Sequence, residues 1–243
     1  MEIISPGHHP VADRFWHFAL GEKPNGARTL GKAQAKNLAD LFEPYYDLMV
    51  TYASEHEFDI PKGAKRIAVM VHQNYPWQAG LRSWQKVNSK LSNYDVDYFV
   101  NEETLLKLIK ESGGRAFLLP RFIDTTEYPT FNVERTHPTL WYGNAWGEFQ
   151  FEYETYLNSV AEPFWVSHGR LGFGDMPLGE VNRQKALEIL AKSEKIWAIG
   201  VSQLEARFYG AEVVSYRGDI LPYYDQHTIR PYVKKLLEEI KSE

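Results

Sequence analysis

The segment from Arg66 to His72, RIAVMVH, constrains the fold of this chain more than any other. Its apolar side chains follow one another without alternation, which is typical of a strand that is buried on both faces. Strands of this kind occur in parallel sheets, whose crossover connections place helices on the faces. The segment therefore predicts an α/β fold built around a parallel sheet.

Short strands alternate with helical segments in both halves of the chain. We expect further strands at 2–5, 48–52, 96–100, 116–119, 140–142, 164–167, 196–201 and 212–215. Between the halves, the stretch 121–138 contains two prolines and no hydrophobic period, which indicates a linker. Alternating strands and helices predict parallel sheets with right-handed crossovers. We therefore expect two small, doubly wound, Rossmann-like domains, an N-terminal one over 1–130 and a C-terminal one over 131–243.

Two helices have ends that the sequence identifies. Asn101 is expected to cap a helix that runs to Lys110, and the glycines after Ser112 to end it. The last helix begins near Thr228. One face of this helix is apolar and needs a surface to pack on. The residues of that face are Ile229, Val233, Leu236, Leu237 and Ile240.

The composition excludes several classes of function. Lys and Arg number 27 against 32 Asp and Glu, a net charge of −5 without a long basic stripe, which argues against a dedicated nucleic-acid surface. The chain has no cysteine, so disulfides, thiolate zinc sites and cysteine nucleophiles are excluded. The N-terminus lacks the pattern of a signal peptide, and no apolar run approaches the ~18 residues of a membrane helix. We expect a soluble, cytoplasmic protein.

Ligands of parallel sheets bind beyond the carboxyl ends of the strands, so the loops that follow the strands hold the candidate residues. Gly7 and His8 follow the first strand, where glycine lets the backbone approach a ligand and imidazole can donate to a hydroxyl or phosphate. A Pro-Gly turn with exposed histidines is an equally good interpretation. His72 ends the most buried strand and opens the run HQNYPW, which suits the hydroxyls and apolar face of a sugar. We favour this role over that of a structural histidine.

Two acidic motifs have a structural explanation beside a functional one. Asp95 and Asp97 have the spacing of carboxylate pairs that hold a divalent ion against a diphosphate. They stand at the start of their strand, however, so we favour a surface acidic pair. Glu205 falls in the first turn of a helix that follows a strand, where the helix dipole alone stabilises a carboxylate by about 0.3–1 kcal/mol. Held there rigidly, the same carboxylate could accept both hydroxyls of a ribose.

The second half contains a pattern that is similar to a known family. The run from Trp197 to Ala206, followed by Gly210 to Val214, resembles the C-terminal domain of GT-B glycosyltransferases, particularly the large retaining family that uses nucleotide sugars. In that family a strand ends in the pattern E-G-F-G, and a second carboxylate follows in E-A. Gly200 and Glu205 match this pattern, whereas Trp197 stands in the place of the first carboxylate.

Weaker likenesses extend to both halves. The runs 119–124 and 179–193 are similar to the start of the family's linker and to the segment before the carboxylate motif. Pro6 and Gly7 fall where the family has its glycine-containing first loop. His72 matches the histidine that often ends a central strand and faces the sugar. The chain thus resembles a shortened member of the family, of the kind that a viral genome would carry.

The resemblance implies two domains facing across a cleft, and transfer of a sugar from a nucleotide sugar, UDP-linked in our expectation, to a small-molecule or glycan acceptor. It assigns the nucleotide and donor contacts to Glu205, Gly200, Gly143, Asn144 and Arg170. His72 is the implied catalytic residue, and Gly7 and His8 lie on the acceptor side. Neither a cofactor nor a metal ion is implied, because backbone amides, a helix N-terminus and basic side chains neutralise the leaving diphosphate. The final helix of such enzymes commonly crosses back onto the first domain.

Departures from the family leave two other functions open. After the strand that ends at Tyr142 the family has Gly-Arg and a nearby Lys, which bind the diphosphate. This chain has Gly143 and Asn144 there, and no Lys before Lys185. A non-catalytic nucleotide- or glycan-binding protein derived from the same fold would show such losses. Modification of hydroxylated DNA bases is a third hypothesis, which the net negative charge disfavours.

Overall fold

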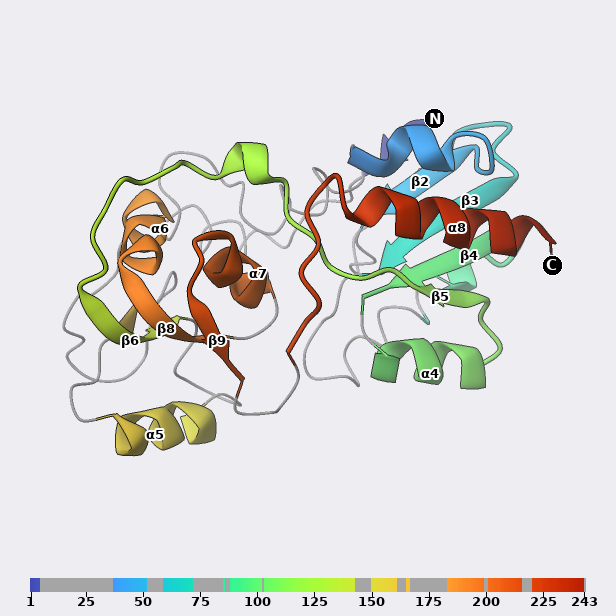
Figure 1. Ribbon diagram of the computed structural model, residues 1–243. Helices are drawn as coiled ribbons and strands as arrows, with labels where there is room; N and C mark the ends of the chain where they lie inside the picture. The colour runs from blue at the N-terminus through green and yellow to red at the C-terminus, as the bar shows by residue number, and fades with distance from the viewer. Residues whose placement is uncertain are drawn as a thin grey trace. The chain divides into compact units, whose positions relative to one another are not determined.

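The computed structural model describes residues 1–4, 37–51, 59–71, 85, 88–101, 103–142, 150–160, 165–166, 183–198, 201–215 and 220–242. These residues form an α/β fold with two parallel sheets flanked by helices, an arrangement compatible with Rossmann-like domains (Figure 1). The chain divides into two compact units. The described residues up to Asp124 and from Tyr224 onward form the first unit, and those from Thr125 to Tyr223 form the second.

The first unit contains a five-stranded parallel sheet in the order β1 (Glu2–Ile4), β2 (Leu48–Thr51), β3 (Arg66–Val71), β4 (Asp95–Val100) and β5 (Ala116–Leu118). It is flanked by α4 (Glu103–Glu111), α8 (Ile229–Ser242) and the helical segment 37–42. The strands follow one another in chain order. Among the described strands, this sheet therefore lacks the reversal of order that a doubly wound sheet has.

The prediction that β3 is buried on both faces is confirmed. Ile67, Ala68, Val69 and Met70 are at most 3% exposed. Because successive side chains of a strand point to opposite faces, Ile67 and Val69 join a core cluster with α4. Ala68 and Met70 join a second cluster with α8 and the segment 37–42. The unbroken apolar run thus supplies two cores, one on each face of the sheet.

The end of α4 is as predicted, whereas its beginning is not. Gly113 has a φ of 85°, and the N–H of Gly114 donates to the carbonyl of Ile109 at 2.9 Å, which is the Schellman arrangement of a helix C-terminus. Asn101 does not cap the helix: α4 begins at Glu103, and the buried Oδ1 atom of Asn101 accepts no hydrogen bond from the described part of the chain. The cap position directly precedes the first helical residue, so Asn101 lies one residue too early.

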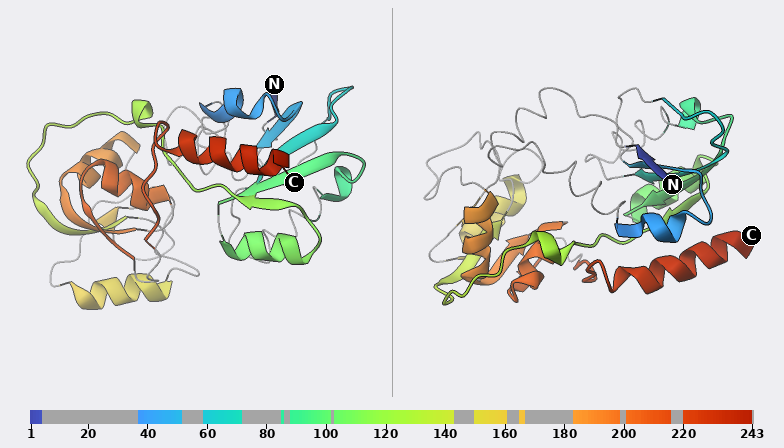
Figure 2. Two further views of the ribbon diagram at one scale, coloured as in Figure 1. Left: turned by 45° about the vertical axis from the view of Figure 1, so that its right-hand side comes forward. Right: turned by 90° about the horizontal axis from the view of Figure 1, so that it is seen from above.

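The terminal helix α8 completes the core of the first unit. Figures 1 and 2 show α8 beside the helical segment 37–42. Its buried side chains lie in one cluster with Phe42, Met49 and Phe99, and they are Ile229, Val233, Leu237 and Ile240. By position in the chain these residues fall within the expected C-terminal domain, but they pack on the first sheet. Among the described helices, none is long and apolar enough to cross a membrane.

The second unit contains a four-stranded parallel sheet in the order β7 (Trp165–Val166), β6 (His137–Tyr142), β8 (Ser193–Ala198) and β9 (Glu212–Val214). The second unit also contains α5 (Gln150–Ser159), α6 (Arg183–Ala191) and α7 (Val201–Phe208). From β6 the chain goes to β7 on one side and then to β8 on the other. This reversal places a topological switch point between β6 and β8, where open α/β sheets bind ligands at the carboxyl ends of the strands.

Aromatic packing joins α5 to the second sheet. Trp141 and Trp197 are paired residues of β6 and β8, and the ring of Tyr156 lies 5.7 Å from each of their rings. Trp197 is the residue that stands in the place of the family's first carboxylate. Its contact with Tyr156 gives it a packing role in this chain.

Candidate functional site

The carboxyl edge of the second sheet is the candidate functional site. Tyr142 is the last residue of β6, and it is paired with Ala198, the last residue of β8. Both are buried. The helix α7 begins at Val201, shortly after β8 ends. The two strands on either side of the switch point therefore end level with each other, and α7 starts at the same edge.

Glu205 on α7 is a buried carboxylate at this edge, only 3% exposed. The hydroxyl of Tyr128 donates to its Oε1 at 2.9 Å, and the hydroxyl of Tyr142 donates to its Oε2 at 3.1 Å. We call these three residues the Glu205 cluster. Burying a carboxylate is costly unless it is hydrogen-bonded, so the two tyrosine hydroxyls help to stabilise Glu205 in the interior.

The helix dipole is a smaller influence on Glu205 than the sequence suggested. The residue was expected in the first turn, but α7 begins at Val201 and has no acidic residue in that turn. Glu205 lies in the second turn, and the dipole effect falls off within the first. The tyrosine hydroxyls replace the dipole as the structural explanation. Sequence reasoning missed both tyrosines, because they lie 77 and 63 residues before Glu205 and no local pattern links them to it.

Arg135 fixes the end of α7 against the start of β8. Its guanidinium donates to the carbonyls of Tyr209 and Gly210 at 2.9 and 2.7 Å, and to that of Ser193 at 3.1 Å. Gly210 has a φ of 73°, and a Cβ atom there would lie 3.0 Å from the guanidinium. The helix that carries Glu205 is thus anchored at its C-terminus.

Gln203 and Arg207 tie α7 to the segment that leads out of the second unit. The side chain of Gln203 donates to the carbonyl of Ala198 at 3.3 Å and accepts from the N–H of Leu221 at 2.9 Å. Arg207 donates to the carbonyl of Leu221 at 2.6 Å, and its guanidinium lies 5.9 Å from the ring centre of Tyr223. These contacts hold α7 against the end of β8 and against Leu221 and Tyr223.

The other predicted site residues lie outside the described residues. They are His72, Gly7, His8, Gly143, Asn144, Gly200 and Arg170. Three of them follow strands that the structure describes. Val71 directly before His72 ends β3, Tyr142 directly before Gly143 ends β6, and Ala198 at the end of β8 comes two residues before Gly200.

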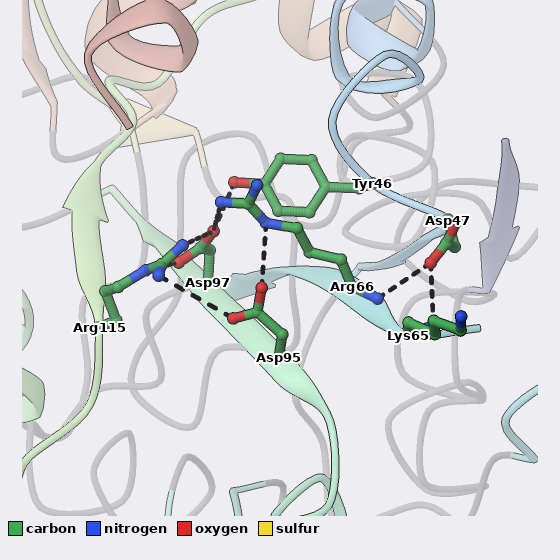
Figure 3. Close-up of polar contacts among 7 residues, drawn as sticks. All are labelled: Tyr46, Asp47, Lys65, Arg66, Asp95, Asp97 and Arg115. Carbon is green, nitrogen blue, oxygen red and sulfur yellow. Dashed lines mark hydrogen bonds and ion pairs between the residues drawn. The ribbon is translucent and has the colours of Figure 1, made fainter. Parts of the chain in front are cut away.

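Asp95 and Asp97 stand at the amino end of β4, as expected, but they are not a solvated surface pair. Figure 3 shows both carboxylates between Arg66 of β3 and Arg115, which directly precedes β5. The side chain of Asp97 is 0% exposed, whereas that of Asp95 is 54% exposed. The expectation was wrong for Asp97, because the sequence did not reveal that the neighbouring strands bring two guanidinium groups to it.

The oxygens of Asp97 accept four hydrogen bonds from three residues. Its Oδ2 accepts from the hydroxyl of Tyr46 at 2.7 Å, from Nη2 of Arg115 at 2.7 Å and from Nη2 of Arg66 at 3.2 Å. Nε of Arg115 donates to Oδ1. Burial, together with the hydrogen bond to Asp97, raises the pKa of Tyr46 far above its usual value. The hydrogen bond to Asp97 also raises the pKa of Arg115.

Asp47 fixes the start of β3 in the same region. Its Oδ2 accepts from the backbone N–H groups of Lys65 and Arg66 at 2.8 and 3.0 Å (Figure 3). These hydrogen bonds lower the pKa of Asp47 below its usual range. All of these contacts lie at the amino ends of the strands, opposite the edge where parallel sheets bind ligands. We call Asp97, Tyr46, Arg66 and Arg115 the Asp97 network, and we infer that it serves the stability of the first unit.

Comparisons with known proteins add no family to this picture. No protein-family model matches the chain, and no curated protein matches it significantly.

Proposed function

We propose that this chain is a glycosyltransferase of the GT-B type, which moves a sugar from a nucleotide sugar to a hydroxyl-bearing acceptor. In this reaction the acceptor hydroxyl loses its proton and its oxygen forms a bond to the anomeric carbon, while the bond from that carbon to the nucleoside diphosphate breaks and the diphosphate leaves as an anion. Two α/β units with parallel sheets are compatible with the proposal. The observation that carries it is the position of Glu205, a held carboxylate beside the switch point of the second sheet.

The second unit takes the nucleotide in this proposal. Glu205 accepts the ribose hydroxyls, a role that suits a carboxylate with capacity for several hydrogen bonds. Gly200, Gly143 and Asn144 follow β8 and β6 in sequence, and we assign them to the diphosphate side, with Arg170 as a source of positive charge. A UDP-linked sugar is the donor that the family resemblance suggests.

The first unit takes the acceptor and the transferred sugar. His72, as the proposed catalytic residue, follows β3 in the sequence, and Gly7 and His8 come after β1. Both strands run in the same direction in the parallel sheet. We add Asn101 to the proposed acceptor site. It directly follows β4, whose last residue, Val100, is paired with Val71, the last residue of β3. The Oδ1 atom of Asn101 is buried and has no hydrogen-bond partner among the residues that the structure describes. A buried acceptor without a donor is costly, and a sugar hydroxyl would satisfy it.

The test of the proposed function is nucleotide binding by Glu205→Gln. The substitution keeps the size of the side chain and removes its charge. Loss of a charged hydrogen bond is expected to weaken binding of uridine diphosphate by about 1.5–3 kcal/mol, or roughly ten- to a hundredfold in Kd. Calorimetry with uridine diphosphate and its 2′,3′-dideoxy counterpart isolates the ribose contact. Glu194→Gln, at an exposed carboxylate of β8, is the matched control. An unchanged ribose preference in Glu205→Gln would refute the assignment.

A non-catalytic nucleotide- or glycan-binding protein is the second candidate. It is favoured by Trp197, an aromatic residue packed against Tyr156 where the family has a carboxylate. The two candidates differ in turnover. Slow release of free sugar from the nucleotide sugar supports the enzyme, whereas tight nucleotide binding without any turnover supports the binding protein.

A further inference from the structure

We propose that Asn101 is a specificity-determining residue of the first unit, which selects a neutral sugar hydroxyl as its ligand group and rejects a phosphate. The inference rests on the proposed function, since it assumes that the first unit takes the acceptor and the transferred sugar. It goes further in naming the chemical group that this edge of the first sheet accepts and the one that it rejects.

Asn101 stands at the point where three neighbouring strands end. Val100, the last residue of β4, is paired on one side with Val71, the last residue of β3. On the other side it is paired with Leu118, the last residue of β5. Ligands of parallel sheets bind beyond the carboxyl ends of the strands. Asn101 is therefore the first residue beyond β4 at the edge of the first sheet where a ligand is expected.

The carboxamide oxygen of Asn101 differs from the other acceptors around it. Its Oδ1 is buried, and no donor of the described residues reaches it. The carbonyl of Val100, one residue earlier, accepts from the N–H of Leu119 at 2.7 Å. Asn88 of the same unit has its Oδ1 paired with the hydroxyl of Tyr98 at 2.7 Å. Most buried polar atoms in proteins are hydrogen-bonded, and the exceptions include atoms that serve a function.

A ligand can reach the side chain of Asn101 because the residue is only half-buried. The terminal torsion of an asparagine has a broad distribution, so the carboxamide can turn without leaving a favoured conformation. A small rotation would present Oδ1 to a group that arrives from the exposed side of the residue. The hydrogen bond formed there would replace an acceptor that is unpaired in the free protein.

The chemistry of this edge favours a hydroxyl over a phosphate. A carboxamide oxygen can only accept a hydrogen bond. A hydroxyl has a proton to give it, whereas an ionised phosphate oxygen has none and carries a charge that the oxygen repels. Glu103 is the first residue of α4 and is exposed. Its negative charge lies at the helix end that would otherwise attract an anion.

The first experiment tests whether Oδ1 is unpaired, by urea unfolding of the parent, Asn101→Leu and Asn88→Leu. Leucine has nearly the shape of asparagine and no polar atom. Asn101→Leu removes an unpaired buried acceptor, so it should unfold at a higher urea concentration than the parent. Asn88→Leu, the matched control, leaves the hydroxyl of Tyr98 without its acceptor and should unfold at a lower one. A lower midpoint for Asn101→Leu would show that Asn101 supports the fold, and the inference would fail.

The second experiment follows the side-chain amide signal of Asn101 in ¹⁵N NMR spectra, where it is identified by its absence from Asn101→Leu. The probes are glucose, galactose, N-acetylglucosamine and inorganic phosphate. At least one sugar is expected to shift this signal, to leave that of Asn88 in place and to bind Asn101→Leu about three- to tenfold more weakly. Phosphate should shift neither signal. A shift of the Asn101 signal by phosphate, or by none of the sugars, would overturn the proposed selectivity.

The outcomes separate this inference from the function on which it rests. The proposed function is tested by nucleotide binding to Glu205→Gln, which involves no free sugar. If the ribose preference depends on Glu205 but no sugar shifts the Asn101 signal, the proposed function stands and the role of Asn101 is wrong. If a sugar binds through Asn101 but the ribose preference is unchanged in Glu205→Gln, the selectivity of the first unit stands and the nucleotide assignment fails.

Discussion

Asp97 illustrates how a single buried charge is accommodated in the first unit. It lies under Tyr46 and between the guanidinium groups of Arg66 and Arg115, so its charge is paired and its oxygens are hydrogen-bonded. A buried ion pair adds little net stability compared with an apolar pair, but the loss of one partner leaves the other uncompensated. The network therefore makes the fold intolerant of change at this residue.

Asp97→Asn is expected to lower the free energy of unfolding by about 3 kcal/mol, because the two arginines then lose their shared carboxylate. Asp95→Asn, at the half-exposed neighbour, should cost less than about 1 kcal/mol. Urea unfolding of both variants, with tryptophan fluorescence as the signal, measures the difference. An equal loss in the free energy of unfolding for the two variants would show that burial does not make Asp97 more important for stability than Asp95.

A residue of the candidate site or of the core could be predicted from the sequence only where the pattern that identifies it lies within one continuous segment. The position of Glu205 after a strand is visible locally, and so is the continuous apolar run of β3. Its partners Tyr128 and Tyr142, and the arginines around Asp97, come from distant segments that strand register brings together. No spacing rule connects them, so their roles appear only when the sheets are assembled.

At the scale of elements, the most consequential contact is that between α8 and the helical segment 37–42. Arg230 donates to both oxygens of Asp40 and, at 2.7 Å, to the carbonyl of Asn37. The hydrogen bonds from Arg230 hold the pKa of Asp40 below its usual value. A carboxylate whose pKa is lower in the folded than in the unfolded protein stabilises the fold above its unfolded pKa. That contribution is lost as the pH falls through the folded pKa.

Arg230→Gln is expected to raise the pKa of Asp40 toward its ordinary value of about 4. The stability of the variant should therefore depend less on pH below that value than the stability of the parent does. NMR titration of the carboxyl carbons measures the pKa directly. Glu188, whose pKa is lowered by its hydrogen bond from Lys192 in the second unit, is an internal control and should not change. An unchanged pKa of Asp40 would show that Arg230 is not its main partner in solution.

Element type was easier to predict than element boundaries. The strands at 66–72 and 140–142 and the amphipathic terminal helix are present as β3, β6 and α8. The strand expected at 196–201 instead runs from Ser193 to Ala198, because Val201 already belongs to α7. Asn101 and Glu205 were misplaced relative to their helices for the same reason. The first residue of a helix depends on tertiary contacts as well as on local propensity.

At the scale of the whole molecule, the chain does not divide into two units at a single point near residue 130, as the sequence had suggested. The chain leaves the first unit after Asp124 and returns at Tyr224, and Ile123 forms a bridge with Asp225 where the two passages meet. The apolar face of α8 could be predicted from its period, whereas its packing on the first domain was expected only from the family resemblance. Its partners are side chains of β2, β3 and β4 that alternate along strands far away in the sequence.

A single cut shortly after the chain enters the second unit should therefore leave the molecule in one piece. A protease site inserted between Asn132 and Val133, in a part of the chain without helix or strand, divides it into fragments 1–132 and 133–243. The second fragment carries α8, whose buried face belongs to the core of the first unit. The fragments are expected to elute together in gel filtration and to separate in denaturant.

Leu237→Asp places a charge in that core at a cost of several kcal/mol, so the same cut in this variant should release the first fragment or cause it to aggregate. Separation of the fragments in the parent would show that α8 does not hold them, and joint elution in the variant would show that another contact does.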